Sequence, residues 1–208
     1  MELSFLQAQI KPHFIFNALS TISSLSIKDP KLAKEMILDM ADYLRLSFDF
    51  DNHAGLSNLG REIDLVKAYI AIEKIRFGNR LNIVMEVADD IDCTLPILCI
   101  QPLVENAIIH GVLKSENDGE VKLYIGWVDN FIRISVSDTG IGISKDVIDL
   151  VLSQKRTVGH VGLNNIHMRL KKLYGSGLNF TQSDAYHTII YFDVPYISKE
   201  AMDESFAR

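Results

Sequence analysis

The stretch SDTGIGIS, from Ser137 to Ser144, places an acid and two glycines directly after a strand-like run. Asp138 could accept a hydrogen bond from an exocyclic amine such as that of adenine, because a carboxylate acts only as an acceptor. Gly140 and Gly142 allow left-handed backbone angles and the close approach of a flat or charged ligand. Taken alone, the stretch is equally compatible with an ordinary β-turn.

The helix-like stretch PLVENAIIHG, from Pro102 to Gly111, carries polar side chains within an apolar pattern. Asn106 and His110 lie four residues apart and therefore share one face of a helix. An Asn that faces inward from an apolar helix needs a polar partner, and phosphate oxygens with Mg²⁺ would provide one. The alternative is an Asn that caps a neighbouring loop.

A third stretch, TVGHVGLNNIHMRL from Thr157, places Gly159 and Gly162 at the expected start of a helix. Backbone N–H groups at a helix start bind phosphate well. Such a pair of glycines is weak support by itself. Its occurrence after the acid-glycine turn and the Asn-bearing helix makes a nucleotide site the favoured interpretation.

A fourth stretch, QIKPHFIFN from Gln9 to Asn17, puts a proline and a histidine inside a run that otherwise forms one long helix. Pro12 has no N–H and its ring displaces the chain, so we expect a kink there. His13 aligns with Gln9 and Asn17 at intervals of four, beside the apolar stripe. A neutral imidazole is a good nucleophile at neutral pH, although a lone helical His is more commonly a surface or packing residue.

The apolar spacing of residues 1–50 predicts two helices, separated at Asp29-Pro30. Two helices cannot bury both of their apolar stripes, whereas two such hairpins can, as a four-helix bundle. We therefore expect a homodimer. The stripes comprise Leu3, Leu6, Ile10, Phe14, Ala18, Ile22 and Leu25, and then Leu32, Met36, Met40, Tyr43 and Leu44.

The remainder of the chain mixes helices and strands without strict alternation, which favours an α+β two-layer sandwich over a Rossmann-like sheet. We expect a linker at residues 51–60, the sandwich at 61–197 and a flexible tail at 198–208. Helices are expected at 61–77, over 96–113 and from about 161, and strands at 80–87, 121–128, 131–138, near LNFTQ and near TIIYFDV.

The composition is that of a soluble globular protein, with 208 residues and a net charge of −6. The negative charge argues against nonspecific nucleic-acid binding, which depends on Lys and Arg. No apolar run is long enough to cross a bilayer, and the chain is expected to be a fragment of a longer one. Cys93 and Cys99 match no metal-binding spacing and are expected to be reduced core residues.

With these stretches in this order, the chain resembles the sensor histidine kinases of the LytS/YehU/YesM type. The stretch PHFIFNALSTI is similar to the phosphoacceptor box of that family, and YIAIEKIRF to the helix that follows its linker. The resemblance covers nearly the whole chain. It implies the Bergerat ATP-binding sandwich that histidine kinases share with gyrase, Hsp90 and MutL, with ATP and Mg²⁺ as its ligands.

The resemblance also implies roles for individual residues. Asp138 would bind the adenine amine, Asn106 would hold Mg²⁺ against the triphosphate, and Thr188 would support adenine through water. The other positions of the two glycine boxes are Gly140, Gly142, Gly159, Gly162 and Leu163.

The same resemblance implies that His13 takes the γ-phosphoryl group of ATP and passes it to an aspartate on a response-regulator receiver domain. Many histidine kinases carry an acid after this His, whereas this chain has Phe14, so Glu105 becomes the candidate base. Asn17 would orient water for dephosphorylation of the partner. The chain would be the cytoplasmic part of a bacterial inner- or plasma-membrane protein, with its membrane contact in an N-terminal part.

Departures from the family pattern keep two other functions open. His160 stands where a glycine is usual and Ile109 where a lysine often reaches phosphate, so His110, Lys155 or Arg156 would have to supply the charge. These departures would suit a degenerate kinase that acts as a nucleotide-binding interaction module. The third function is a gyrase-like or Hsp90-like ATPase, which is disfavoured because Pro102 occupies the position of the water-activating glutamate.

Overall fold

The computed structural model describes residues 12–48, 55–153, 161–183 and 185–196. Several positions singled out in the sequence lie outside these residues, as do the expected tail and the segment before Pro12. These positions are Gly159, His160, Lys155 and Arg156.

The expected helical hairpin is present as α2 (Pro12–Lys28) and α3 (Pro30–Phe48). The break falls at Asp29, whose carboxylate accepts a hydrogen bond from the backbone N–H of Leu32 at 3.0 Å and so caps α3. The kink at Pro12 stays a prediction, because what precedes this residue lies outside the described part.

A five-stranded sheet and its helices make up the rest, which confirms the α+β class. The sheet has the order β2-β4-β5-β7-β6, in which β2 and β4 are parallel and the other pairs antiparallel. A separate two-stranded ribbon pairs β1 with β3. The elements are β1 (Leu56–Asn58), α4 (Leu59–Phe77), η1 (Gly78–Arg80), β2 (Leu81–Val87), β3 (Thr94–Pro96), α5 (Gln101–Asn106), η2 (Ala107–Gly111), η3 (Val112–Lys114), β4 (Gly119–Val128), β5 (Phe131–Asp138), α6 (Lys145–Leu152), α7 (Val161–Tyr174), β6 (Asn179–Thr181) and β7 (Thr188–Pro195).

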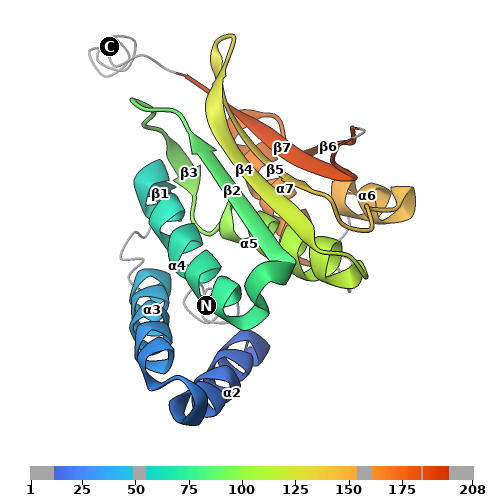
Figure 1. Ribbon diagram of the computed structural model, residues 1–208. Coiled ribbons are helices and arrows are strands. Elements are labelled where there is room, and N and C mark those ends of the chain that lie inside the picture. Colours follow the sequence, from blue (N-terminus) through green and yellow to red (C-terminus); the bar gives the residue numbers. More distant parts are fainter. Residues whose placement is uncertain (1–11, 49–54, 154–160, 184, 197–208) are drawn as a thin grey trace, which may run out of the picture.

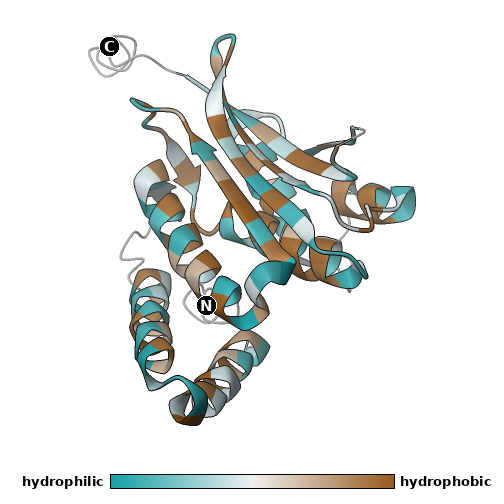
Figure 2. Cartoon of the chain, in the orientation of Figure 1, coloured by the Kyte–Doolittle hydropathy of each residue, from teal (hydrophilic) through white to brown (hydrophobic). Residues whose placement is uncertain are grey.

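The sheet has one face toward the helices and one face open in the view of Figure 1, where α5 and α7 lie behind the strands. Hydrophobic and hydrophilic residues alternate along the strands (Figure 2), as expected when one face is buried. The open face carries its own ion pairs, including Arg133 to Asp193 at 2.7 Å and Lys122 to Glu86 at 2.8 Å. Among the described helices, none combines the length and apolar character needed to cross a membrane.

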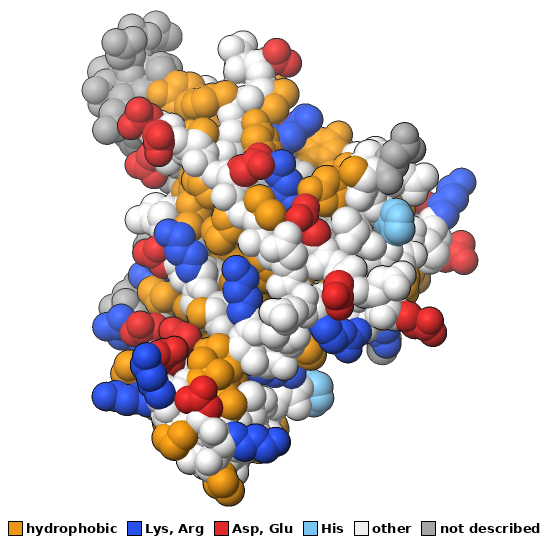
Figure 3. All heavy atoms as spheres, viewed as in Figure 1, with side chains coloured by type: hydrophobic (Ala, Val, Ile, Leu, Met, Phe, Trp, Pro, Cys, Tyr) orange, Lys and Arg blue, Asp and Glu red, His pale blue; other side chains and the backbone are white. Residues whose placement is uncertain are grey.

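The hairpin packs against α4 of the same chain, which the sequence did not predict. Phe14 on α2 lies 5.0 Å from Tyr43 on α3 and 5.1 Å from Tyr69 on α4, measured between ring centroids. Much of the predicted stripe is therefore buried within one chain. Other large apolar side chains stay exposed at this end of the molecule, where Figure 3 shows hydrophobic surface, and they are Phe16, Leu19, Ile27, Ile37, Leu38 and Phe48.

Two predicted boundaries are wrong. The expected linker at 51–60 contains β1 and the first turn of α4 in its described part. The helix expected over 96–113 begins only at Gln101, because residues 97–100 form a buried turn in which Leu98 has a φ of 54°. These residues are apolar because the turn is buried, and their spacing resembles the apolar face of a helix, which explains the wrong prediction.

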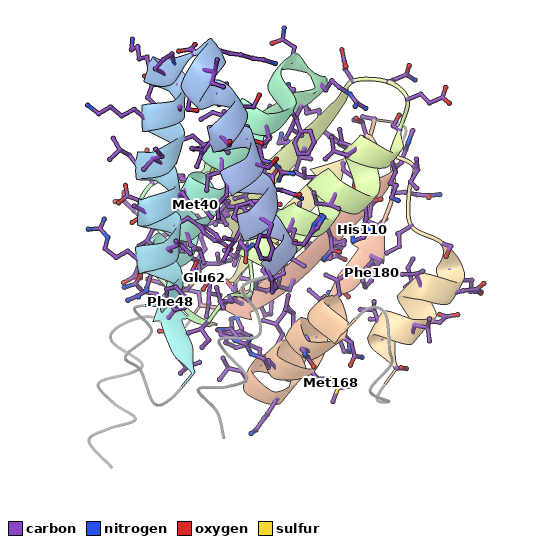
Figure 4. All side chains as sticks on the ribbon, turned by 90° about the horizontal axis from the view of Figure 1, so that it is seen from below. Met40, Phe48, Glu62, His110, Met168 and Phe180 are labelled. Carbon is purple, nitrogen blue, oxygen red and sulfur yellow. The ribbon has the colours of Figure 1, made fainter. Side chains whose placement is uncertain are left out.

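The buried turn is held by the carboxylate of Glu62, a residue of α4 that is completely buried. Its two oxygens accept hydrogen bonds from the backbone N–H groups of Leu98, Cys99 and Ile100 at 2.7, 2.9 and 3.1 Å. Burial raises the pKa of Glu62, whereas these three N–H groups and the nearby Arg169 guanidinium oppose the rise. Arg169, on α7, also donates to the carbonyl of Ile97. Figure 4 places Glu62 in the packed interior.

We expect Glu62→Gln to lower the free energy of unfolding by about 3 kcal/mol, because the amide loses the charge and turns an NH₂ group toward backbone donors. Urea denaturation followed by circular dichroism measures this change. The matched control is Glu35→Gln on the exposed face of α3, for which we expect less than about 0.5 kcal/mol. Equal stability of the two variants would contradict the anchoring role.

Candidate functional site

A cavity of about 1090 Å³ lies at the end of the sheet where β5 stops and β7 starts. Its volume is sufficient for a nucleotide, since small-molecule sites typically measure roughly 300–1,000 Å³. Figure 4 shows His110 on the helical segment that follows Asn106, on the side of the molecule where α6 and α7 lie. The lining residues come from distant parts of the chain and are Asn106, Ala107, His110, Gly111, Lys114, Asp138, Ile141, Gly142, Ile143, Ser144, Val147, Leu163, Gln182, Ser183, His187, Thr188 and Ile190.

Asp138 ends β5 in the wall of this cavity, where only 3% of its surface is exposed. Burial raises the pKa of its carboxyl group, while the Gly140 N–H, the Thr188 hydroxyl and the charge of His187 act in the opposite direction. Thr188 lies directly opposite Asp138 in the β5–β7 register. A buried acceptor is thus presented beside a hydroxyl, an arrangement that could bind an amine of a flat ring.

The turn after Asp138 requires glycine at two positions. Gly140 packs against the backbone of Gly111, so that a Cβ atom at Gly140 would lie 2.1 Å from the carbonyl carbon of Gly111. Gly142 has a φ of +80°, which a side chain would strain. The first glycine box therefore has a steric reason in this fold: the turn lies directly on the helical segment that carries Asn106.

Asn106 is the last residue of α5 and lines the cavity. Its amide nitrogen donates to the carbonyl of Pro102 at 2.7 Å. Because the nitrogen is held by the helix, the amide oxygen is the atom left to bind a cation such as Mg²⁺, for which amide oxygens are suitable ligands. The residues present at this position therefore fit the predicted metal role.

The remaining predicted nucleotide-binding residues are partly brought together. His110, Gly142, Leu163 and Thr188 line the cavity, and Gly140 lies buried directly behind its wall. Gly162 opens α7 and Gly159 lies outside the described residues. The second glycine box is anchored next to α6, because the side-chain nitrogen of Asn164 donates to the carbonyls of Val151 and Ser153, both at 2.8 Å.

Two basic residues that line the cavity were not predicted from the sequence. His187 was not among the candidate site residues, yet it lines the cavity with Asp138. Lys114 also lines the cavity, at the end of η3. The position of His187 directly before Thr188 was the available signal. By contrast, His167 does not line the cavity and is a packing residue, because its Nδ1 accepts from the backbone N–H of Leu178 at 3.1 Å.

Glu105 is adjacent to Asn106 but does not line the cavity. It is buried and lies close enough to Tyr43 and Tyr69 to raise the pKa of both hydroxyls, after burial as the main cause. Glu73, in the same group, has its pKa raised to about 7, mainly by burial, with Arg76 opposing the shift. Glu105 therefore faces the hairpin and not the nucleotide-sized cavity.

His13 is exposed on α2, so its ring is accessible to a reactant. The amide nitrogen of Asn17 lies 3.2 Å from Nδ1 and 3.3 Å from Nε2 of the imidazole. An amide N–H can only donate, so a ring nitrogen that accepts from Asn17 must carry a lone pair. His13 is not among the residues that line the cavity in the described part of the chain.

Two families match the sequence. The family described as "Histidine kinase" matches residues 1–81, and the family described as "Histidine kinase-, DNA gyrase B-, and HSP90-like ATPase" matches residues 92–198. The first match includes the hairpin and α4, and the second includes the cavity.

Among the described residues, no group of His, Cys, Asp and Glu side chains could by itself hold a metal ion.

Curated relatives share much of the sequence. An uncharacterised protein, YwpD of Bacillus subtilis, is 45% identical over 86% of this chain and 64% of its own length. The sensor histidine kinase YpdA of Escherichia coli is 39% identical over 93% of this chain, and the sensor protein LytS of Streptococcus mutans is 34% identical over 99%. The chain spans only 34% of the length of YpdA and 36% of that of LytS.

Solved structures with low sequence identity share the fold. The catalytic domain of the histidine kinase ThkA has a TM-score of 0.52 at 17% identity, covering 67% of this chain and 94% of its own. The histidine kinase domain of a blue-light-activated kinase from Erythrobacter litoralis has a TM-score of 0.52 at 20% identity, covering 93% and 92%.

We expect Gly140→Ala to weaken binding of ATP in the presence of Mg²⁺ by at least about tenfold, because the added Cβ must displace the turn from Gly111. Isothermal titration calorimetry measures the dissociation constant. Gly60→Ala in α4 is the matched control, since its Cβ would meet the nearest atom at an ordinary 3.6 Å. Unchanged binding in the first variant would show that the turn does not shape the site.

Proposed function

The chain belongs to the sensor histidine kinases, and from that premise we propose that it binds ATP in the described cavity and autophosphorylates on His13. The phosphoryl group then passes to an aspartate on the receiver domain of a response regulator. The observation that carries this proposal is the combination of the Asp138–Asn106 cavity with an exposed imidazole held by Asn17.

The reaction is a displacement at the γ-phosphorus of ATP. A bond forms between an imidazole nitrogen of His13 and phosphorus, the bond to the bridging β-γ oxygen breaks, and ADP leaves. The transition state is loose, so positioning and charge stabilisation supply most of the catalysis. Mg²⁺ held at Asn106 would neutralise charge on the triphosphate.

The imidazole of His13 must release a proton to a base during the transfer. The next residue, Phe14, is buried and has no group that could accept this proton, so the base must lie elsewhere. We keep Glu105 as the proposed base. In the described arrangement it faces Tyr43 and Tyr69, so it would meet His13 only after the hairpin moves. His110, four residues after Asn106 and also in the cavity lining, is the proposed source of positive charge near the triphosphate.

Because His13 does not line the cavity, transfer needs either a movement of the hairpin or the His13 of a second copy. We propose a homodimer, which the exposed apolar side chains of α2 and α3 support. Phe16 and Ile27 are 69% and 86% exposed, and such side chains are usually covered in an assembly. A parent protein tethered to the membrane through an N-terminal part is consistent with the curated relatives being described as sensors.

A degenerate kinase that binds nucleotide and acts by dimerisation is the second candidate, since Ile109 and His160 depart from the family pattern. It predicts tight ATP binding without phosphohistidine. A simple ATPase is less well supported, because Pro102 in the first turn of α5 cannot activate water.

We expect incubation with ATP labelled in the γ-phosphate to give an acid-labile label on the wild-type chain and none on His13→Ala. The loss follows from removal of the nucleophile. Matched ATP affinity in both proteins, measured by calorimetry, separates loss of the acceptor from loss of the nucleotide. Acid-labile label that survives the substitution would refute the assignment of His13.

We expect Asn17→Ala to slow dephosphorylation of the phosphorylated receiver domain by about tenfold, because the amide that would orient water is removed. Release of phosphate from that domain is the measurement. Thr21→Ala, one turn further along α2, is the control. An unchanged dephosphorylation rate in a variant that still autophosphorylates would contradict this role.

A further inference from the structure

His187 occupies a position in the nucleotide cavity that the family resemblance does not assign. It directly precedes Thr188 at the start of β7 and lines the cavity with Asp138 and Gly142. The Cβ of His187 would lie 3.8 Å from a Cβ placed on Gly142. Its side chain therefore borders the glycine turn.

The ring and the backbone of His187 hold both ends of that turn. Its backbone N–H donates to the carbonyl of Asp138 at 2.9 Å, and its Nδ1 is hydrogen bonded to the carbonyl of Gly140. A carbonyl can only accept, so Nδ1 carries the proton in this bond. The N–H of Gly140 in turn donates to the Asp138 carboxylate at 2.9 Å.

The Gly140 residue is thus clamped through both of its polar groups, its N–H by Asp138 and its carbonyl by His187. The turn cannot move toward η2, because Gly140 already packs against the backbone of Gly111. The neighbouring Thr139 is held by Glu120, because its N–H donates to the Glu120 carbonyl at 3.1 Å and its Oγ1 accepts from the Glu120 N–H at 2.9 Å, whereas the Gly140 carbonyl is held by the His187 imidazole. The orientation of the Asp138 carboxylate depends on the same restraint, since Gly140 is one of its donors.

We infer that His187 is a positioning residue that selects adenine nucleotides by fixing the Gly140 peptide and, through it, the Asp138 carboxylate. This inference rests on the proposed nucleotide-binding function. The carboxylate accepts from the exocyclic amine of adenine, whereas guanine carries a carbonyl oxygen at the corresponding ring position and offers no donor there. Precise placement of Asp138 therefore favours ATP over GTP.

Three substitutions separate the clamp from a general structural role. His187→Asn keeps a donor close to the position of Nδ1, His187→Gln moves the donor one bond further out, and His187→Phe removes it. Isothermal titration calorimetry with ATP and with GTP, each with Mg²⁺, gives the two dissociation constants for every variant. Thermal unfolding without nucleotide reports on folding.

We expect the Phe and Gln variants to bind ATP about tenfold more weakly, the loss of one positioned hydrogen bond, and to bind GTP as the wild type does. The Asn variant should bind ATP within about threefold of the wild type. The inference is overturned if all variants match the wild type, if ATP and GTP affinities fall together, or if Asn fails to rescue. A wild-type chain that binds neither nucleotide would instead refute the proposed function.

Discussion

The buried carboxylate of Glu62 is the interaction on which the arrangement of the site depends. The carboxylate accepts hydrogen bonds from three backbone N–H groups in the turn that leads into α5. Arg169 from α7 donates a hydrogen bond to the carbonyl of Ile97 in the same turn. A buried turn of this kind would otherwise leave several donors without partners, at a cost of about 1–3 kcal/mol each. The helices that supply Asn106 and the second glycine box are therefore placed by one residue of α4, outside the cavity.

The short helix α5 then has two separate faces. Asn106 points into the cavity, while Glu105, one residue earlier, contributes to the buried group around Tyr43 and Tyr69. Consecutive residues of a helix point about 100° apart, so a single turn can serve two neighbours. The cavity and the hairpin that carries His13, the proposed phosphoacceptor, thus meet across one helix, and the buried core runs continuously from Phe14 to the last strand.

Much of this could be predicted from local pattern. The strands of β4 and β5, the break at Asp29 and the Asp138 turn follow from alternation, proline and glycine, which act over a few residues. The start of α5 could not be predicted, because residues 97–100 are apolar through burial around a distant carboxylate. The role of His187 could not be predicted either, because it also depends on a long-range contact: its hydrogen bond to Gly140 joins positions 47 residues apart. Contacts between residues distant in the sequence produce no local pattern of residue types from which they could be predicted.

The docking of the hairpin on α4 combines favourable and unfavourable contacts. Aromatic packing of Phe14, Tyr43 and Tyr69 favours it. Glu73 lies at the same contact, and its pKa is raised to about 7, mainly by burial, although Arg76 and a side-chain hydrogen bond from Tyr69 oppose the rise. The cost of burying this carboxyl group offsets part of the packing energy, so separating the hairpin costs less than its buried area suggests. The proposed transfer of a phosphoryl group from ATP to His13 and on to a partner domain requires the hairpin to move, and a weakened contact with α4 would allow that movement.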